Sequence, residues 1–128
     1  MKYAIYISIW VALIVAVVMA FLPLFSMAAQ PDVCTFAELR LKEVQTDWSH
    51  AGFYRMAAPL QKATSTKGTW RENLARNFND EASVYEAWKK SPSHNANLVA
   101  TSSASCLRHA NGYWVLITWS PLRTIKKH

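Results

Sequence analysis

The sequence predicts an α+β domain in which helices cover both faces of a small antiparallel sheet. Two segments, 35–50 and 80–91, carry apolar residues at helical spacing. Near the C-terminus, Asn111-Gly112 separates two strand-like segments, and Asn-Gly is the strongest short signal for a β-hairpin. The second of these segments, 113–119, shows no polar alternation, as expected of a strand with both faces covered. These observations together predict a three-layer α-β-α sandwich.

Residues 1–29 are predicted to be a signal peptide or membrane anchor that precedes one domain, residues 30–128. Lys2 is followed by an almost uninterrupted apolar run over 3–25, and the small residues before Ala29 suit cleavage by signal peptidase after Ala28 or Ala29. A run of about 20 apolar residues is also long enough to span a bilayer, so retention as an anchor stays open. Either outcome exports residues 30–128, because Lys2 is the only charge before the run. We therefore expect an extracytoplasmic protein, secreted or periplasmic, with possible membrane association through residues 3–25.

The net charge of the chain and the distribution of its basic residues limit the classes of partner that we expect it to bind. The formal net charge is +6, which favours acidic envelope polymers or anionic lipid headgroups as neighbours, with simple solubility as the alternative. The basic residues are scattered and form no stripe interleaved with aromatic residues, so we expect no nucleic-acid binding. The sequence also lacks a glycine-rich phosphate loop and a nucleophile elbow.

Cys34 and Cys106 are the only cysteines of the chain. In an exported protein, such a pair is expected to form one disulfide, and two buried free thiols are the alternative. The bridge would close a loop of about 70 residues and stabilise the fold by about 4 kcal/mol in the chain-entropy model.

The first helix is expected to begin at a capping box formed by Thr35 and Glu38 and to end at Ser49 or His50. Arg40 is placed on one of its polar faces. The apolar stripe that should face the core consists of Ala37, Leu41, Val44 and Trp48. Gly52 and Pro59 bound the next segment, and residues 64–68 form a loop.

The second helix is expected to be capped by Asn79 or Asp80 and to bury Trp88. Pro92 should end it, because proline cannot continue a helix that precedes it. The polar stretch 93–105 is predicted to be irregular, and the hairpin follows it.

Three separate motifs, in order, resemble the CAP superfamily, the SCP-like domain of cysteine-rich secretory proteins, antigen 5 and plant pathogenesis-related proteins. Trp48-Ser49-His50-Ala51-Gly52 is similar to the end of the family's first helix. Arg71-Glu72-Asn73-Leu74-Ala75 resembles the Gly-Glu-Asn-Leu/Ile-Ala motif, with arginine in place of glycine. The segment 87–98 resembles the bacterial Trp-x-x-Ser-Pro-x-His-x-x-Asn-Leu pattern. The resemblance implies a shortened, bacterial-type CAP domain with a small antiparallel sheet.

This resemblance implies that His50, Glu72 and His94 converge in a cleft and bind a divalent metal, Zn²⁺ or another divalent cation. Two imidazoles and a carboxylate are suitable zinc ligands, and three ligands leave a position for water. Ser91 occupies the position of the family's second glutamate, so the full set is incomplete. For Glu72 the alternative is a buried structural carboxylate that accepts backbone amides. His109 and His128 are expected to be solvated.

The function expected from these features is that of a noncatalytic binding or interaction module at the cell envelope. Its cleft would bind a divalent metal, a lipid or another envelope component, and its partner could also be a protein. One alternative is a metal-dependent hydrolase in which His50, Glu72 and His94 activate water to cleave an envelope peptide or glycan. A second alternative is a membrane-anchored envelope factor with a structural or exclusion role.

Overall fold

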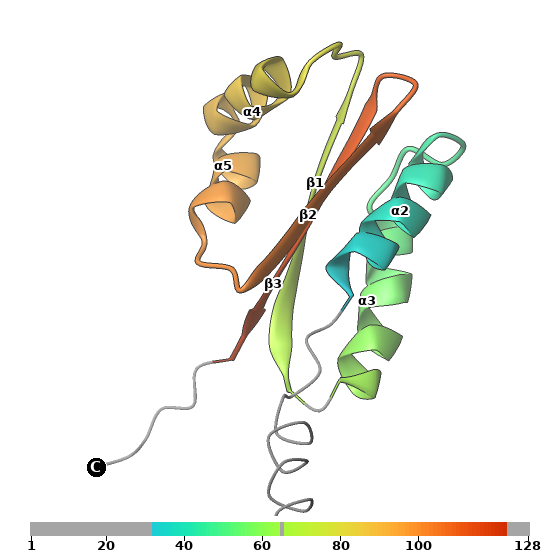
Figure 1. The fold of residues 1–128 in the computed structure, drawn as a ribbon, viewed down its shortest axis with the longest axis vertical. Helices are drawn as coiled ribbons and strands as arrows, with labels where there is room; N and C mark the ends of the chain where they lie inside the picture. Colours follow the sequence, from blue (N-terminus) through green and yellow to red (C-terminus); the bar gives the residue numbers. More distant parts are fainter. Residues whose placement is uncertain (1–31, 65, 123–128) are drawn as a thin grey trace, which may run out of the picture.

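A computed structural model describes residues 32–64 and 66–122 of the chain (Figure 1). The predicted N-terminal segment and His128 lie outside these ranges. Within them, no helix has the length and apolar character needed to cross a membrane. The elements in chain order are α2 (Val33–Val44), α3 (Ala51–Ala63), β1 (Gly68–Arg76), α4 (Glu81–Lys90), α5 (Pro92–Val99), β2 (Ala104–Ala110) and β3 (Tyr113–Pro121).

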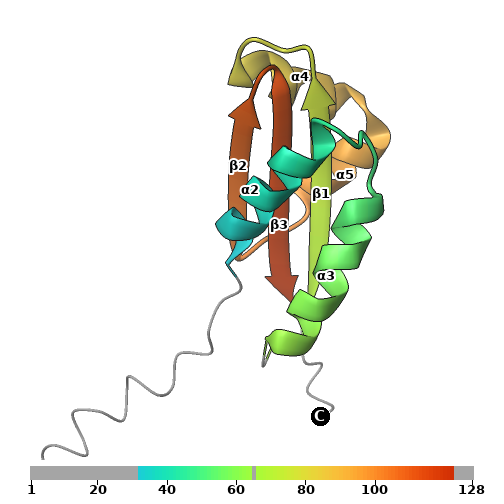
Figure 2. The ribbon, with the colours of Figure 1, turned by 90° about the vertical axis from the view of Figure 1, so that its right-hand side faces the viewer.

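The three strands form one antiparallel sheet in the order β1-β3-β2, so β3 is central and β1 is an edge strand. Helices α2 and α3 lie on one face of the sheet, and α4 and α5 lie on the other (Figures 1 and 2). The expected α+β architecture with helices on both faces is therefore confirmed. The continuous apolar character of β3 follows from its position, since a central strand between two helical layers has no solvent face.

The predicted hairpin connects β2 to β3 through a two-residue turn. Both turn residues have positive φ, 53° at Asn111 and 76° at Gly112. This is the backbone combination of a type I′ turn, whose twist matches that of the flanking strands. The Asn-Gly signal thus sets the register that pairs Ala110 with Tyr113.

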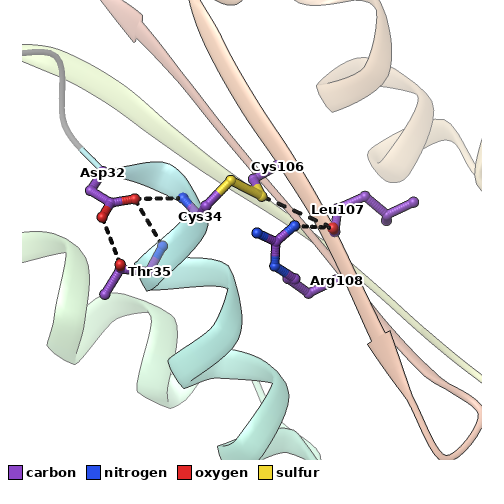
Figure 3. The surroundings of a disulfide bond; sticks show 6 residues. All are labelled: Asp32, Cys34, Thr35, Cys106, Leu107 and Arg108. Atoms are coloured by element: carbon purple, nitrogen blue, oxygen red, sulfur yellow. Dashed lines mark hydrogen bonds between the residues drawn. A yellow bond between two sulfur atoms is a disulfide. The ribbon is translucent and has the colours of Figure 1, made fainter.

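The α2/α3 face of the sheet carries the larger apolar core. Phe36 stacks on Phe53 with ring centroids 5.7 Å apart, which joins the two helices. The central strand contributes Val115, Ile117 and Trp119 to this core. At one end of α2, the predicted disulfide joins Cys34 to Cys106 of β2 (Figure 3). A disulfide is typical of proteins that fold in an oxidising, extracytoplasmic compartment.

The α4/α5 face carries a smaller core centred on Trp88. This side chain is 2% exposed, as predicted, and packs with Val84, Trp114 and Leu116. Its indole N–H donates to the carbonyl oxygen of Leu74 at 3.0 Å, which ties α4 to strand β1. Asp80 caps α4 by accepting the amide of Ser83, so the second of the two predicted caps is the one used.

The first helix differs from the prediction at both ends. Asp32, not Thr35, is the cap, because its carboxylate accepts the amides of Cys34 and Thr35 (Figure 3). The helix also stops at Val44, and the backbone carbonyl of Glu43 then accepts the amides of residues 46 and 47. The polar residues Thr46 and Asp47 compete locally for backbone hydrogen bonds, which disfavours further helix. Trp48 therefore lies on a connecting segment and is 38% exposed.

Three elements were not predicted at all. Helix α3 continues through Pro59, which lacks only the hydrogen bond to the carbonyl of residue 55. Strand β1 shows no apolar alternation, because the charged Glu72 lies on its buried face. Helix α5 occupies part of the stretch expected to be irregular, and Pro92 is its first residue, a position where proline is favoured.

Candidate functional site

A cleft of about 290 Å³ lies along the open edge of β1, between the first turns of α3 and helix α5. Because α3 and α5 belong to opposite layers, side chains from both layers reach this cleft around the edge strand. Its lining residues are His50, Phe53, Tyr54, Trp70, Arg71, Glu72, Ser93, His94 and Asn97. The structure thus brings the three residues expected from the family resemblance to one cleft.

Arg40 of α2 forms a buried ion pair with Glu72. The Arg40 guanidinium donates to both carboxylate oxygens, with Nε to Oε2 at 2.6 Å and Nη2 to Oε1 at 3.1 Å. Arg40 is fully buried and the Glu72 side chain is 1% exposed. Arg40 also donates to the Glu43 carboxylate and to the carbonyl oxygen of Ser49. Burial alone would lower the pKa of Arg40, but hydrogen bonds and charge from Glu72, and then from Glu43, raise it above its usual value.

Arg40 was expected on a polar face of its helix, and the structure corrects this. It follows Ala37 by three residues and precedes Val44 by four, so it lies on the same buried stripe. A charged residue within such a stripe indicates a buried ion pair, and this signal was already present in the sequence. The partner could not be identified, because Glu72 is 32 residues away.

His50 approaches the same carboxylate from the cleft side. Its Nδ1 lies 2.8 Å from Oε1 of Glu72. Since an ionised carboxylate only accepts hydrogen bonds, Nδ1 carries the proton, and in the neutral ring Nε2 keeps its lone pair. His50 immediately precedes α3, and the next glycine, Gly52, lies so close to Arg40 and Glu43 that a Cβ atom there would overlap their side chains. The Arg40–Glu43 pair thus sets how closely this end of α3 approaches α2.

His94 reaches the cleft from the first turn of α5. Its Nδ1 lies 2.8 Å from the hydroxyl of Ser91, the residue at the position of the family's second glutamate. Burial lowers the pKa of His94, and the nearby charge of His50 lowers it further. Both imidazoles thus use Nδ1 for an intramolecular contact.

A network of side-chain amides joins α5 to β1 beside the two histidines. Asn97 donates from Nδ2 to the backbone carbonyl of Glu72 at 3.2 Å and to Oδ1 of Asn73 at 2.8 Å. Asn73 in turn donates to the backbone carbonyl of His94 at 3.0 Å. These bonds fix α5 against the strand. Asn73 and Asn97 stand in the family-like motifs, but their roles were not predicted, because they depend on a contact between a strand and a helix.

Glu72 does not fit the role of a metal ligand. Both its oxygens accept hydrogen bonds from Arg40, and one is shared with His50, so the guanidinium already neutralises its charge. Its partners are side chains, not the backbone amides of the alternative interpretation. Among residues 32–64 and 66–122, no three or more His, Cys, Asp or Glu side chains are grouped so as to hold a metal ion.

His109 lies outside the cleft. It was expected to be solvated, and it is exposed and stacks on Trp114 with ring centroids 4.3 Å apart.

The CAP resemblance rests on the three motifs alone. Comparison of the chain with protein-family models, with curated proteins and with solved structures gives no match.

Proposed function

We propose that this chain is a noncatalytic, extracytoplasmic binding module whose cleft at the edge of β1 receives a component of the cell envelope. The observation that carries the proposal is the composition of the cleft. Aromatic rings from α3 and β1 and one imidazole from each helical layer line one open space, whereas the one carboxylate among the described lining residues is already paired with Arg40. Binding sites commonly combine apolar walls with a few placed polar groups.

The aromatic residues supply the walls of this site. Phe53 is buried and Tyr54, the next residue of α3, is 70% exposed, with their ring centroids 5.3 Å apart. Tyr54 therefore offers an accessible aromatic surface on a rigid support. His94 and Asn97 supply hydrogen-bonding groups on the opposite side, from α5.

Cosedimentation of the purified protein with envelope material from its own host tests the proposal. Tyr54→Ala and His94→Ala should each reduce the bound fraction, because both side chains line the cleft. Val99→Ala is a matched control, since Val99 is exposed on α5 and does not line the cleft. Lipid vesicles in a parallel arm distinguish a lipid from a polymer. Equal sedimentation of all four proteins would contradict the proposal.

The hydrolase alternative retains one supporting observation, the contact between His50 and Glu72. Carboxylates that accept the second ring N–H of a histidine commonly orient a metal-bound imidazole. In that arrangement, Nε2 of His50 and of His94 would be the donors and Glu72 would only orient His50. Calorimetry with Zn²⁺ decides the matter: a metal site requires binding that is lost in both His50→Ala and His94→Ala and weakened below about pH 6.

The anchor alternative concerns residues 1–29 and is tested separately. N-terminal sequencing of the exported protein should give a start at Ala29 or Gln30 if the segment is cleaved. An intact N-terminus would instead support a membrane-anchored envelope factor.

A further inference from the structure

The α4/α5 face of the sheet changes character along its length. Towards the hairpin turn, this face carries the apolar residues Ala75, Leu107, Trp114 and Leu116 of the smaller core and lies beneath α4 and α5. Towards the other end, the same face carries hydroxyl groups and one guanidinium, and the loop 100–103 passes beside it (Figure 1). The residues of this polar end are Thr69, Arg71, Ser105, Thr118 and Ser120.

The polar end borders a second hollow of about 360 Å³. Two of its lining residues, Thr69 and Ser120, are directly paired across β1 and β3, so they lie on the same face. Loop 100–103 adds two more hydroxyl side chains. The lining residues are Thr69, Arg71, Thr101, Ser103, Ser120, Pro121 and Leu122. Arg71 also lines the cleft, so it stands between the two hollows.

Arg71 has far more donor capacity than the described structure uses. Its Nη1 donates to the hydroxyl of Ser120 at 2.9 Å. Within residues 32–64 and 66–122, no carboxylate lies within ion-pair distance of its guanidinium, in contrast to Arg40 and Arg55. A guanidinium carries five N–H donors, so four have no partner among the described residues and can serve a ligand. Directly opposite Arg71 on β3, the buried hydroxyl of Thr118 likewise has no hydrogen-bond partner in this part of the chain.

We propose that Arg71 and the hydroxyls around it form a binding site for an oxyanion, a phosphate or a carboxylate group, next to the cleft. A guanidinium binds either group through two parallel hydrogen bonds, and hydroxyl groups complete the donor set. The net charge of +6 favours the approach of an anionic ligand. This inference goes beyond the proposed function and does not require that the cleft bind a ligand.

Isothermal titration of the full chain in a nonionic detergent tests the site with sodium phosphate and sodium acetate as probes, at constant ionic strength set with sodium chloride. Wild type should bind at least one probe saturably, and the probe that binds more tightly identifies the group. Arg71→Gln should weaken that binding about tenfold or more, because it removes charged hydrogen bonds. Arg76→Gln is the matched control: Arg76 is exposed on the same strand, over the ring of Trp48, and lines neither hollow.

Two additions keep the test decisive if Arg71→Gln folds poorly. Ser120→Ala removes one hydroxyl from the site and should weaken binding severalfold, and His94→Ala should leave it unchanged. The inference is overturned if wild type binds neither probe, or if Arg71→Gln and Arg76→Gln weaken binding equally. It is also overturned if His94→Ala abolishes binding, since the anion would then belong to the cleft. Failure of envelope binding in the cosedimentation experiment leaves this result unaffected, so the two proposals fail independently.

Discussion

The two faces of the sheet are held to their helices by different means. On the α2/α3 face, a disulfide and a buried ion pair of Arg40 with Glu72 accompany the apolar core. On the α4/α5 face, α4 rests on the single large side chain of Trp88, and α5 buries no residue completely. Helix α5 is attached to the strand by the amide network of Asn73 and Asn97.

This difference bears on the cleft, because each face delivers one histidine to it. His50 contacts a carboxylate that is itself fixed by Arg40, so its ring is oriented by a buried network. His94 is positioned by the hydroxyl of Ser91 on a short helix with polar attachments. We expect the α2/α3 side to act as the rigid wall of the cleft and α5 to be the side that opens first, since fewer buried contacts hold it.

The largest effect is expected on the apolar α4/α5 face, from Trp88→Ala. It should lower the free energy of unfolding by about 3 to 5 kcal/mol, because it leaves a cavity and removes the hydrogen bond to Leu74. Chemical denaturation measures this change. Trp48→Ala is the control, with a smaller expected loss of about 1 to 2 kcal/mol for its cation–π contact with Arg76 and its edge contact with the ring of Tyr113. Equal losses would show that the face does not depend on Trp88.

On the opposite face, replacing both Cys34 and Cys106 with serine should cost up to about 4 kcal/mol, since the unfolded chain is no longer constrained. Denaturant midpoints of the variant and of reduced wild type should agree. Thiol labelling of the denatured, non-reduced protein should find no free cysteine. Two labelled thiols per chain would show that Cys34 and Cys106 are not bonded and that the disulfide does not stabilise this face.

The buried ion pair is probed by Arg40→Lys. Lysine keeps the charge but cannot donate to Glu72, Glu43 and the carbonyl of Ser49 in the same geometry. We expect a loss of about 1.5 to 3 kcal/mol in the free energy of unfolding. Arg55→Lys, at an exposed partner of Glu43, should cost about 1 kcal/mol or less. If the two variants lose the same amount, the network does not hold the rigid wall.

The smallest expected effect is a pH dependence at His94. Because its pKa is lowered in the folded protein, the unfolded chain takes up this proton first as the pH falls below about 6.5. Stability should therefore decrease from there down to the folded pKa, and it should be fully present above pH 6.5. Melting temperatures between pH 8 and pH 5 should show a shallower decrease for His94→Gln than for wild type. Identical curves would refute the lowered pKa.

Local signals in the sequence determined several elements of this fold. The Asn111-Gly112 turn, the Asp80 cap and the buried position of Trp88 follow from backbone geometry or from side chains a few residues apart. The pairing of Cys34 with Cys106 followed from the number of cysteines. The triad His50, Glu72 and His94 was collected from family-like motifs, and the structure places all three at one cleft.

Tertiary contacts decided the rest. The sequence pattern did not predict strand β1, because the charged residue Glu72 occupies a buried position. A buried carboxylate is stable there only because Arg40 of a different element pairs with it. The role of Glu72 as a paired, orienting carboxylate depends on that same contact across 32 residues. Helix α5 and the amide network at the edge of β1 depend on a strand that the local pattern did not reveal. Periodicity reports which face a residue occupies, whereas the partner of a buried charge is set by how separate elements pack, and the chemistry of the cleft follows from that packing.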